Sequence, residues 1–249
     1  MTKVKELLPE NTVIVKKPIP MDDSFPEKDY RKYFKYALGK SFTGYMDGGK
    51  TTFATWLGSQ AGKTLKEAAA EWAAQVEEST RLPEPATMEE MLSRRRFNFL
   101  PDANKAFILA FDKAINELGY DFGKAIGDGY GWGLYMIIYG KTGTKSRPVA
   151  ARIYIEHDGE IELRFHLNNV DKHIKHIENV PAHIKDAFTF TGGDCKRCNT
   201  MCAPGKQYTI NGNLMQKCNH STFYFRNPTM EKLPDYMELL AKFFKSKKG

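Results

Sequence analysis

Three stretches in the first half of the chain repeat their apolar residues at the spacing of an α-helix. The first covers residues 65–79 and opens with Thr64 and Glu67, whose separation is typical of a capping box. The second is a short helix that ends near Phe97, and the third runs to a stop at Gly119. These patterns predict a helical region before any long strand appears.

The segments around these helices are less regular. Residues 1–63 mix Pro, Gly and Lys without a clear period, which predicts an extended arm with one short helix around Tyr30–Leu38. Two prolines in residues 82–86 interrupt the helical pattern, and Thr87 with Glu90 then provides a second capping box.

From about residue 131 to 167 the apolar period becomes two, which is typical of half-buried strands. The alternating positions are Trp132, Leu134, Met136 and Ile138, then Val149, Ala151, Ile153 and Ile155, then Ile161, Leu163, Phe165 and Leu167. They predict three strands of an antiparallel sheet with one apolar face.

The turn that contains Gly159 sets the register of the last two strands. A two-residue loop would mix the apolar and polar faces, so we predict a three-residue loop with Gly159 in the left-handed region. This loop pairs Ile155 with Ile161 and Ile153 with Leu163.

The last third of the chain predicts two short helices before residue 190, a hairpin centred on Asn211-Gly212, a strand over 221–225 and a helix over 230–244. The apolar stripe expected on that last helix is Leu233, Met237, Leu240 and Phe244. The predicted fold class is α+β: a helical N-terminal region (residues 1–96), then an α+β domain (97–249). In this domain helices pack on an antiparallel sheet, followed by a zinc-knuckle hairpin and a closing helix.

Composition narrows the class of protein. The 249 residues are 41% hydrophobic and 27% charged, which is typical of a globular chain. We expect a cytoplasmic protein, because no secretory leader or membrane-spanning run is apparent. The net charge of +7 is compatible with weak attraction to polyanions but does not establish nucleic-acid binding.

The four cysteines lie together, in a module at about residues 192–226. They are Cys195, Cys198, Cys202 and Cys218, with the spacing C-x2-C-x3-C-x15-C. In a reducing compartment such a cluster favours thiolate ligands over disulfides. The hairpin at Asn211-Gly212 would carry the fourth cysteine back to the first three, opposite Gly205.

Four converging thiolates predict a closed structural zinc site. An iron–sulfur cluster is the alternative cofactor, His220 could replace Cys218 as a ligand, and free thiols without metal are the remaining interpretation. Basic residues around the cysteines would offset the double negative charge of a zinc tetrathiolate; they are Lys196, Arg197, Lys206 and Lys217.

The polar face of the predicted sheet carries a candidate ligand site. The register above places Arg152 opposite Arg164, and opposed like charges cost stability. Glu162 could neutralise them, and a bound anion is the functional alternative. Glycines that alternate at residues 127–133 indicate a bulge or a close approach of ligand or chain. The candidate ligand-binding residues are Tyr130, Trp132, Arg152, Tyr154, Arg164 and His166.

Residues 44–51 match the phosphate-binding pattern G-x4-G-K-[ST], and a second GKT occurs at residues 62–64. A phosphate loop joins a buried parallel strand to a helix, and the sequence predicts neither here. Arg94, Arg95 and Arg96 raise the choice between anion binding and a solvated helix face. No catalytic triad or carboxylate pair of reliable spacing is recognised.

The chain from Phe97 to Phe244 resembles an uncharacterised family of small anaerobe-associated bacterial proteins. The resemblance rests on GYDFGKAIGDGYGWGLYMIIYGKTG, ARIYI, LNNVDKHIKHIENVPAHIK and CKRC…YTINGNLMQKC. In the order of helices and sheet it is also distantly similar to the YdhG-type domain, for which a frataxin-like role in iron handling has been proposed. The cysteine module departs from that type. The resemblance implies a cytoplasmic α+β domain with a metal knuckle.

These observations predict a non-enzymatic, metal-stapled binding protein for an anionic small molecule or a protein partner. Two alternatives remain: a nucleic-acid-binding protein that uses the basic cysteine knuckle, and a phosphate-loop nucleotide-binding enzyme.

Overall fold

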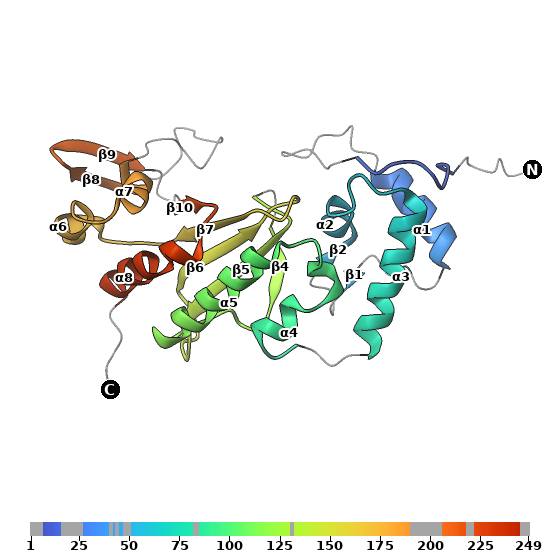
Figure 1. The fold of residues 1–249 in the computed structure, drawn as a ribbon, viewed down its shortest axis with the longest axis horizontal. Helices are drawn as coiled ribbons and strands as arrows, with labels where there is room; N and C mark the ends of the chain where they lie inside the picture. Colours follow the sequence, from blue (N-terminus) through green and yellow to red (C-terminus); the bar gives the residue numbers. More distant parts are fainter. Residues whose placement is uncertain are drawn as a thin grey trace, which may run out of the picture. The chain divides into compact units, whose positions relative to one another are not determined.

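The computed structural model describes residues 7–15, 27–39, 42, 45–46, 51–81, 85–129, 132–189, 206–217 and 222–244 (Figure 1). The fold class is α+β, as predicted. The chain divides into two compact units, each built from several segments. The first unit consists of Met1–Pro101, Lys124–Met136 and Tyr154–Glu160, and the second of Asp102–Gly123, Ile137–Ile153 and Ile161–Gly249. The division expected at residue 96 stays a prediction.

The first unit is organised around two helices, α1 (Glu27–Leu38) and α3 (Leu65–Arg81). The capping box predicted for α3 is present, because the backbone N–H of Thr64 donates to the Glu67 carboxylate at 2.9 Å and the Glu67 N–H donates to the Thr64 hydroxyl at 3.3 Å. Two short strands, β1 (Tyr45–Met46) and β2 (Thr51–Thr52), pair antiparallel and precede helix α2 (Phe53–Gly58).

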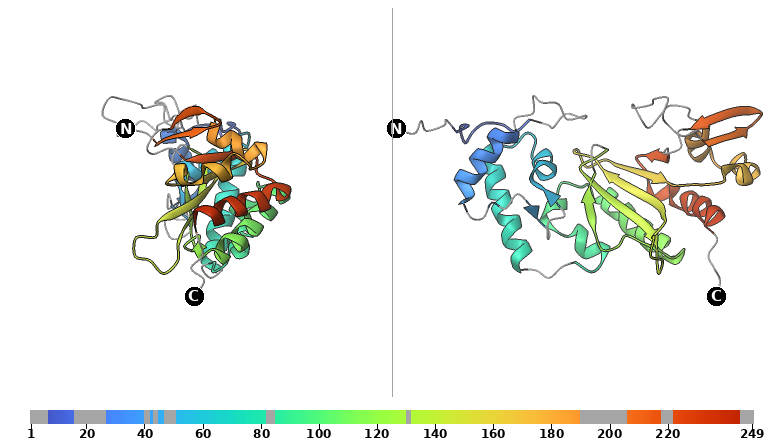
Figure 2. Two further views of the ribbon diagram at one scale, coloured as in Figure 1. Left: turned by 90° about the vertical axis from the view of Figure 1, so that its left-hand side faces the viewer. Right: turned by 180° about the vertical axis from the view of Figure 1, so that it is seen from behind.

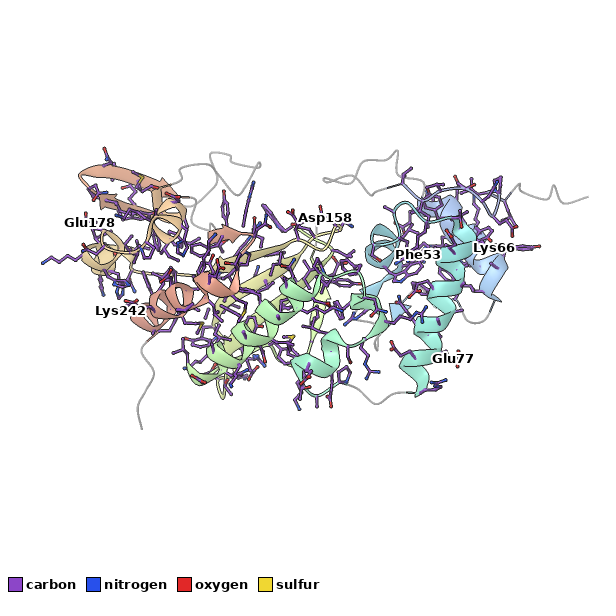
Figure 3. The ribbon with its side chains drawn as sticks, in the orientation of Figure 1. Phe53, Lys66, Glu77, Asp158, Glu178 and Lys242 are labelled. Atoms are coloured by element: carbon purple, nitrogen blue, oxygen red, sulfur yellow. The ribbon has the colours of Figure 1, made fainter. Side chains whose placement is uncertain are left out.

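The short helix predicted around Tyr30–Leu38 is present as α1, whereas the extended arm predicted for the rest of residues 1–63 is wrong for the described residues. Helix α2 also lies within it, and the chain at Ile14 forms backbone hydrogen bonds with Gly62 and Lys63. The physical reason is an aromatic core, visible around the labelled Phe53 in Figure 3. Its rings are Tyr30, Tyr33, Phe34, Phe53, Trp56 and Trp72, all buried. Elements this short show no period, yet burying large rings stabilises them.

The second capping box is also present and opens α4 (Met88–Leu92), which is followed by the short 3-10 helix η3 (Arg95–Phe97). Two of the three arginines here have partners within the fold. Arg95 binds the Glu71 carboxylate of α3 through two hydrogen bonds, of 2.8 and 3.0 Å. Arg96 is buried, with its guanidinium 4.5 Å from the centre of the Phe97 ring.

The main sheet has the strand order β10-β7-β6-β5-β3, and β4 also pairs with β5. The strands are β3 (Tyr120–Asp121), β4 (Ile126–Asp128), β5 (Tyr135–Lys141), β6 (Val149–Ile155), β7 (Ile161–Phe165) and β10 (Phe223–Arg226). Helix α5 (Asp102–Glu117) ends before Gly119, which is left-handed at φ 78° as a helix stop requires.

The predicted three-residue hairpin loop is confirmed. Gly159 has φ 85°, and the Glu156 N–H donates to the Glu160 carbonyl at 2.8 Å. The His166 N–H donates to the Ala150 carbonyl in the same register. Arg152 therefore lies opposite Arg164 on β7, as predicted.

The second unit continues with η4 (Val170–His173), α6 (Ile174–Ile177) and α7 (Ala182–Thr189), then the hairpin β8 (Lys206–Ile210) and β9 (Asn213–Lys217). Ile210 pairs with Asn213, so Asn211-Gly212 is the predicted two-residue loop. The Asn211 N–H donates to the Glu178 carboxylate of the neighbouring segment at 3.0 Å (Figure 3).

The chain closes with η5 (Met230–Lys232) and α8 (Leu233–Phe243). Helices α5 and α8 lie side by side on one face of the sheet (Figure 1 and Figure 2). The buried face of α8 is rotated about the helix axis from the predicted one. The buried residues are Tyr236, Leu239 and Leu240. This face is buried because the Tyr236 ring packs on the rings of Phe225 and Phe165, with ring centroids 5.0 and 6.2 Å apart.

A similar shift occurs on β5. The sequence predicts Trp132, Leu134, Met136 and Ile138 as the inward positions. Leu134 and Met136 are buried, but Trp132 is 44% exposed and Ile138 half-buried. The fully buried set is Tyr135, Ile137 and Tyr139. Strand β5 lies inside the sheet and is covered on both faces along most of its length, so alternation alone could not identify the inner face.

Within the described residues, no helix is both long and apolar enough to cross a membrane.

Candidate ligand-binding site

Strands β7 and β10 carry a row of charged and aromatic side chains on the predicted polar face. Arg164 lies opposite Tyr224, and Glu162 lies opposite Arg226. The Glu162 carboxylate accepts a 2.5 Å hydrogen bond from Nε of Arg164 and lies 3.7 Å from Nε of Arg226. The Arg164 guanidinium also lies 5.7 Å from the centre of the Tyr224 ring. One carboxylate thus pairs with two arginines, closely with Arg164 and loosely with Arg226, and the three side chains together carry a net charge of +1.

This arrangement answers the question of a bound anion for Arg164, one of the two opposed arginines. Glu162, the neutralising group considered from the sequence, pairs closely with Arg164, whose side chain is only 11% exposed. A nearly buried cation needs such a partner, because desolvation of an unpaired charge costs several kcal/mol. Arg164 therefore does not require a bound anion for its stability.

The other predicted ligand-binding residues have different surroundings. Tyr154 is buried at 3% exposure, whereas Trp132 is 44% exposed. Arg152 and His166 are half-buried. Tyr130 lies outside the described residues.

The glycines at the entry to β5 are required by the backbone. A Cβ on Gly129 would lie 2.2 Å from the carbonyl oxygen of Gly133, and one on Gly133 would lie 2.9 Å from that of Ile155. Two chain segments approach each other here more closely than any side chain permits. Of the two explanations the sequence offered, close approach of the chain accounts for these glycines.

A pocket not predicted from the sequence lies beside β10, which is the last strand at one end of the sheet. It has a volume of about 370 Å³, within the range of small-molecule sites. Four elements contribute its walls: α7, β10, η5 and α8. The lining residues are His183, Asp186, Ala187, Tyr224, Phe225, Arg226, Lys232 and Tyr236.

The pocket is lined by both charged side chains and aromatic rings. The Arg226 side chain is 79% exposed, and its ion pair with Glu162 is long. Nε2 of His183 lies 3.2 Å from the Asp235 carboxylate, although the geometry is not that of a directed hydrogen bond. Burial, and to a smaller extent the charge of Asp235, raise the pKa of Tyr236 to about 12. Tyr236 is therefore a neutral wall at physiological pH.

The four cysteines lie outside the described residues, so the structure does not test the predicted metal site. Among the residues that are described, no group of three or more His, Cys, Asp or Glu side chains could hold a metal ion. The adjoining hairpin is described, and its last pair joins Lys206 to Lys217, directly before Cys218 in the sequence.

The two GKT segments differ from a phosphate loop in their described parts. In the first, Tyr45 and Met46 form β1 and Thr51 begins β2, and these strands pair antiparallel, whereas a phosphate loop follows a strand of a parallel sheet. In the second, Gly62 and Lys63 form backbone hydrogen bonds with Ile14, and Thr64 caps α3. Its main-chain groups are thus used within the fold.

Comparison with known proteins found no matching family model, no matching curated protein and no matching solved structure.

Proposed function

We propose that this chain is a non-enzymatic binding protein that takes a small anionic ligand at the β10 edge of its second unit. The observation that carries the proposal is the pocket of about 370 Å³ that has Arg226 and Lys232 among its lining residues. Arg226 is largely exposed and only loosely paired, so an anion could approach it without breaking a buried ion pair. The aromatic walls would cover the apolar part of the ligand.

The proposal moves the anion site from the arginine pair to the adjacent pocket. Arg164 is compensated by Glu162 at 2.5 Å, whereas Arg226 is 3.7 Å from the other oxygen of the same carboxylate. Because the attraction between charges falls with distance, Arg226 is held less strongly by Glu162 than Arg164 is and can interact more strongly with a ligand.

A structural zinc site at Cys195, Cys198, Cys202 and Cys218 is the second part of the proposal. Lys206 and Lys217 are partners in the hairpin register, and Lys217 directly precedes Cys218 in the sequence. Lysines so near the cysteines in the sequence would offset the net charge of −2 of a zinc tetrathiolate. An iron–sulfur cluster would carry negative charge as well, so the metal must be identified by experiment.

Thermal unfolding tests the anion site. Phosphate or sulfate should raise the melting temperature of the wild-type protein more than chloride at matched ionic strength. The increment should disappear in a variant with Arg226→Ala and Lys232→Ala. A matched variant with Lys113→Ala and Lys175→Ala, both exposed and outside the pocket, should keep it. Equal increments in the two double variants would contradict the proposed site.

Metal analysis of anaerobically purified protein tests the cysteine site separately. We expect one zinc per chain, no visible absorption band, and release of four thiols together when zinc is removed. Sub-stoichiometric metal with four freely titrating thiols would contradict the zinc site and would leave the pocket proposal unaffected.

A further inference from the structure

The charges at the pocket are of both signs, which a site for a simple anion does not need. Asp186 of α7 is exposed, and Lys232 of η5 is half-buried. Within the described part of the chain, no ion pair joins either side chain to a residue of opposite charge. The pocket thus presents Arg226 and Lys232 as cations and a separate carboxylate on another wall.

A carboxylate at the pocket acts against a purely anionic ligand. Two like charges repel each other, and water screens this repulsion only in part inside a pocket. The repulsion becomes an attraction if the ligand carries a cationic group toward Asp186. A ligand with both charges therefore fits the pocket better than one with a negative charge alone.

We infer that the pocket binds a small zwitterion with an apolar side group, of the class of a free α-amino acid or a dipeptide. Arg226 and Lys232 hold its carboxylate, and Asp186 accepts from its ammonium group. Phe225 and Tyr236, which pack together at 5.0 Å, provide an apolar wall for the side group. This inference rests on the proposed function and specifies its ligand class.

The size and exposure of the pocket set the expected affinity. A volume of about 370 Å³ accommodates a molecule the size of an aromatic amino acid. Each charged contact is partly exposed to water, so each contributes modestly. We expect dissociation constants of roughly 10 µM to 1 mM, and a loss of about 5-fold when one charged contact is removed.

Calorimetric titration with three related probes tests the inference: L-phenylalanine, N-acetyl-L-phenylalanine, which lacks the ammonium group, and L-phenylalanine amide, which lacks the carboxylate. L-phenylalanine should bind at least 5-fold more tightly than either derivative. L-leucine and the dipeptide Gly-Phe extend the panel to other side groups and lengths.

Substitutions in the pocket test which residue binds the ammonium group of the ligand and which binds its carboxylate. Asp186→Asn should weaken L-phenylalanine about 5-fold and leave N-acetyl-L-phenylalanine unchanged, whereas Lys232→Ala should weaken both. Glu238→Gln and Lys113→Ala, exposed residues outside the pocket, are the matched controls and should bind like wild type.

The outcomes separate this inference from the proposed function. Equal binding of L-phenylalanine and its N-acetyl derivative, or no effect of Asp186→Asn, would overturn the zwitterion while retaining an anion site. If none of the five probes releases or absorbs heat but phosphate still raises the melting temperature of the wild-type protein, the zwitterion inference is overturned and the anion site is retained. If phosphate does not raise the melting temperature either, both the zwitterion inference and the proposed anion site are overturned.

Discussion

The two units of this protein both bury many aromatic rings, but they arrange them differently. In the first unit the rings form a closed cluster: Trp56 and Trp72 meet edge to face at 4.7 Å, and Phe34 contacts both. In the second unit the rings follow one face of the sheet, from Phe111 through Phe165 to Phe225 and Tyr236. The rings of the closed cluster are buried against one another, whereas the row reaches β10 at the end of the sheet, where the pocket lies.

Aromatic rings can therefore serve stability or binding. Which of the two they serve depends on whether their packing is closed on all sides or reaches an edge strand. A cluster closed on all sides excludes water and contributes to the free energy of folding. The row that ends at the edge strand β10 instead brings Phe225 and Tyr236, which are 4% and 1% exposed, to the lining of a pocket that also contains charged residues of neighbouring elements. Phe225 and Tyr236 belong both to the core and to the pocket wall.

The largest effect should follow from opening the closed cluster. Trp72 is fully buried among four other rings, so Trp72→Ala should lower the free energy of unfolding by about 3–5 kcal/mol in urea denaturation. The matched variant Trp132→Ala removes a half-exposed ring and should cost about 1 kcal/mol or less. Similar losses in both variants would contradict the distinction between core and surface tryptophan.

The next effect concerns the charges on the sheet of the second unit. Arg164→Ala leaves Glu162 without its closest partner and should destabilise by about 2 kcal/mol. Arg226→Ala removes the longer, exposed ion pair and should cost less than about 1 kcal/mol. A double-mutant cycle with Glu162→Gln measures each coupling, and equal coupling energies would contradict the geometry.

A smaller effect should depend on pH. Burial and the nearby Asp121 carboxylate raise the pKa of Asp112 on α5 to about 6, against weaker opposing contributions from Tyr139 and Asn116. Because this folded-state value exceeds the usual value of 3.8, the stability it contributes is complete below pH 3.8 and is lost as the pH rises through 6. Asp112→Asn should therefore stabilise the protein at pH 8 by about 1 kcal/mol, after allowance for partial solvent screening. The gain should vanish at pH 4, and a constant difference between these pH values would contradict the prediction.

Much of the fold was predictable because it rests on local chemistry. Helices α3 and α4 begin with the two capping boxes. In each, a threonine and a glutamate three residues apart accept hydrogen bonds from each other's backbone N–H groups, which depends only on neighbouring residues. The loop at Gly159 followed from matching the faces of β6 and β7, and the Asn211-Gly212 turn from the left-handed conformation both residues adopt.

The errors share a different cause. The alternating pattern assigned the inner face to Leu134, Met136 and Ile138 and so omitted Tyr135 and Tyr139, which are fully buried. The helical pattern chosen for the last helix likewise omitted Tyr236, which is 1% exposed. Helix α2 was missed because six residues are too few for a period. In both cases a partner distant in the sequence supplies the packing that decides burial.

The candidate site shows the same limit. The chain alone determined the fold class, the hairpin registers and the pairing of Arg152 with Arg164, because these depend on spacing within one or two neighbouring elements. Only the tertiary structure brought Asp186 of α7, Arg226 of β10 and Lys232 of η5 to one pocket, as they lie in three segments separated by up to 40 residues with no common motif. Which charges face each other there depends on how α7 and α8 pack against the edge strand, and long-range packing of this kind leaves no period in the sequence.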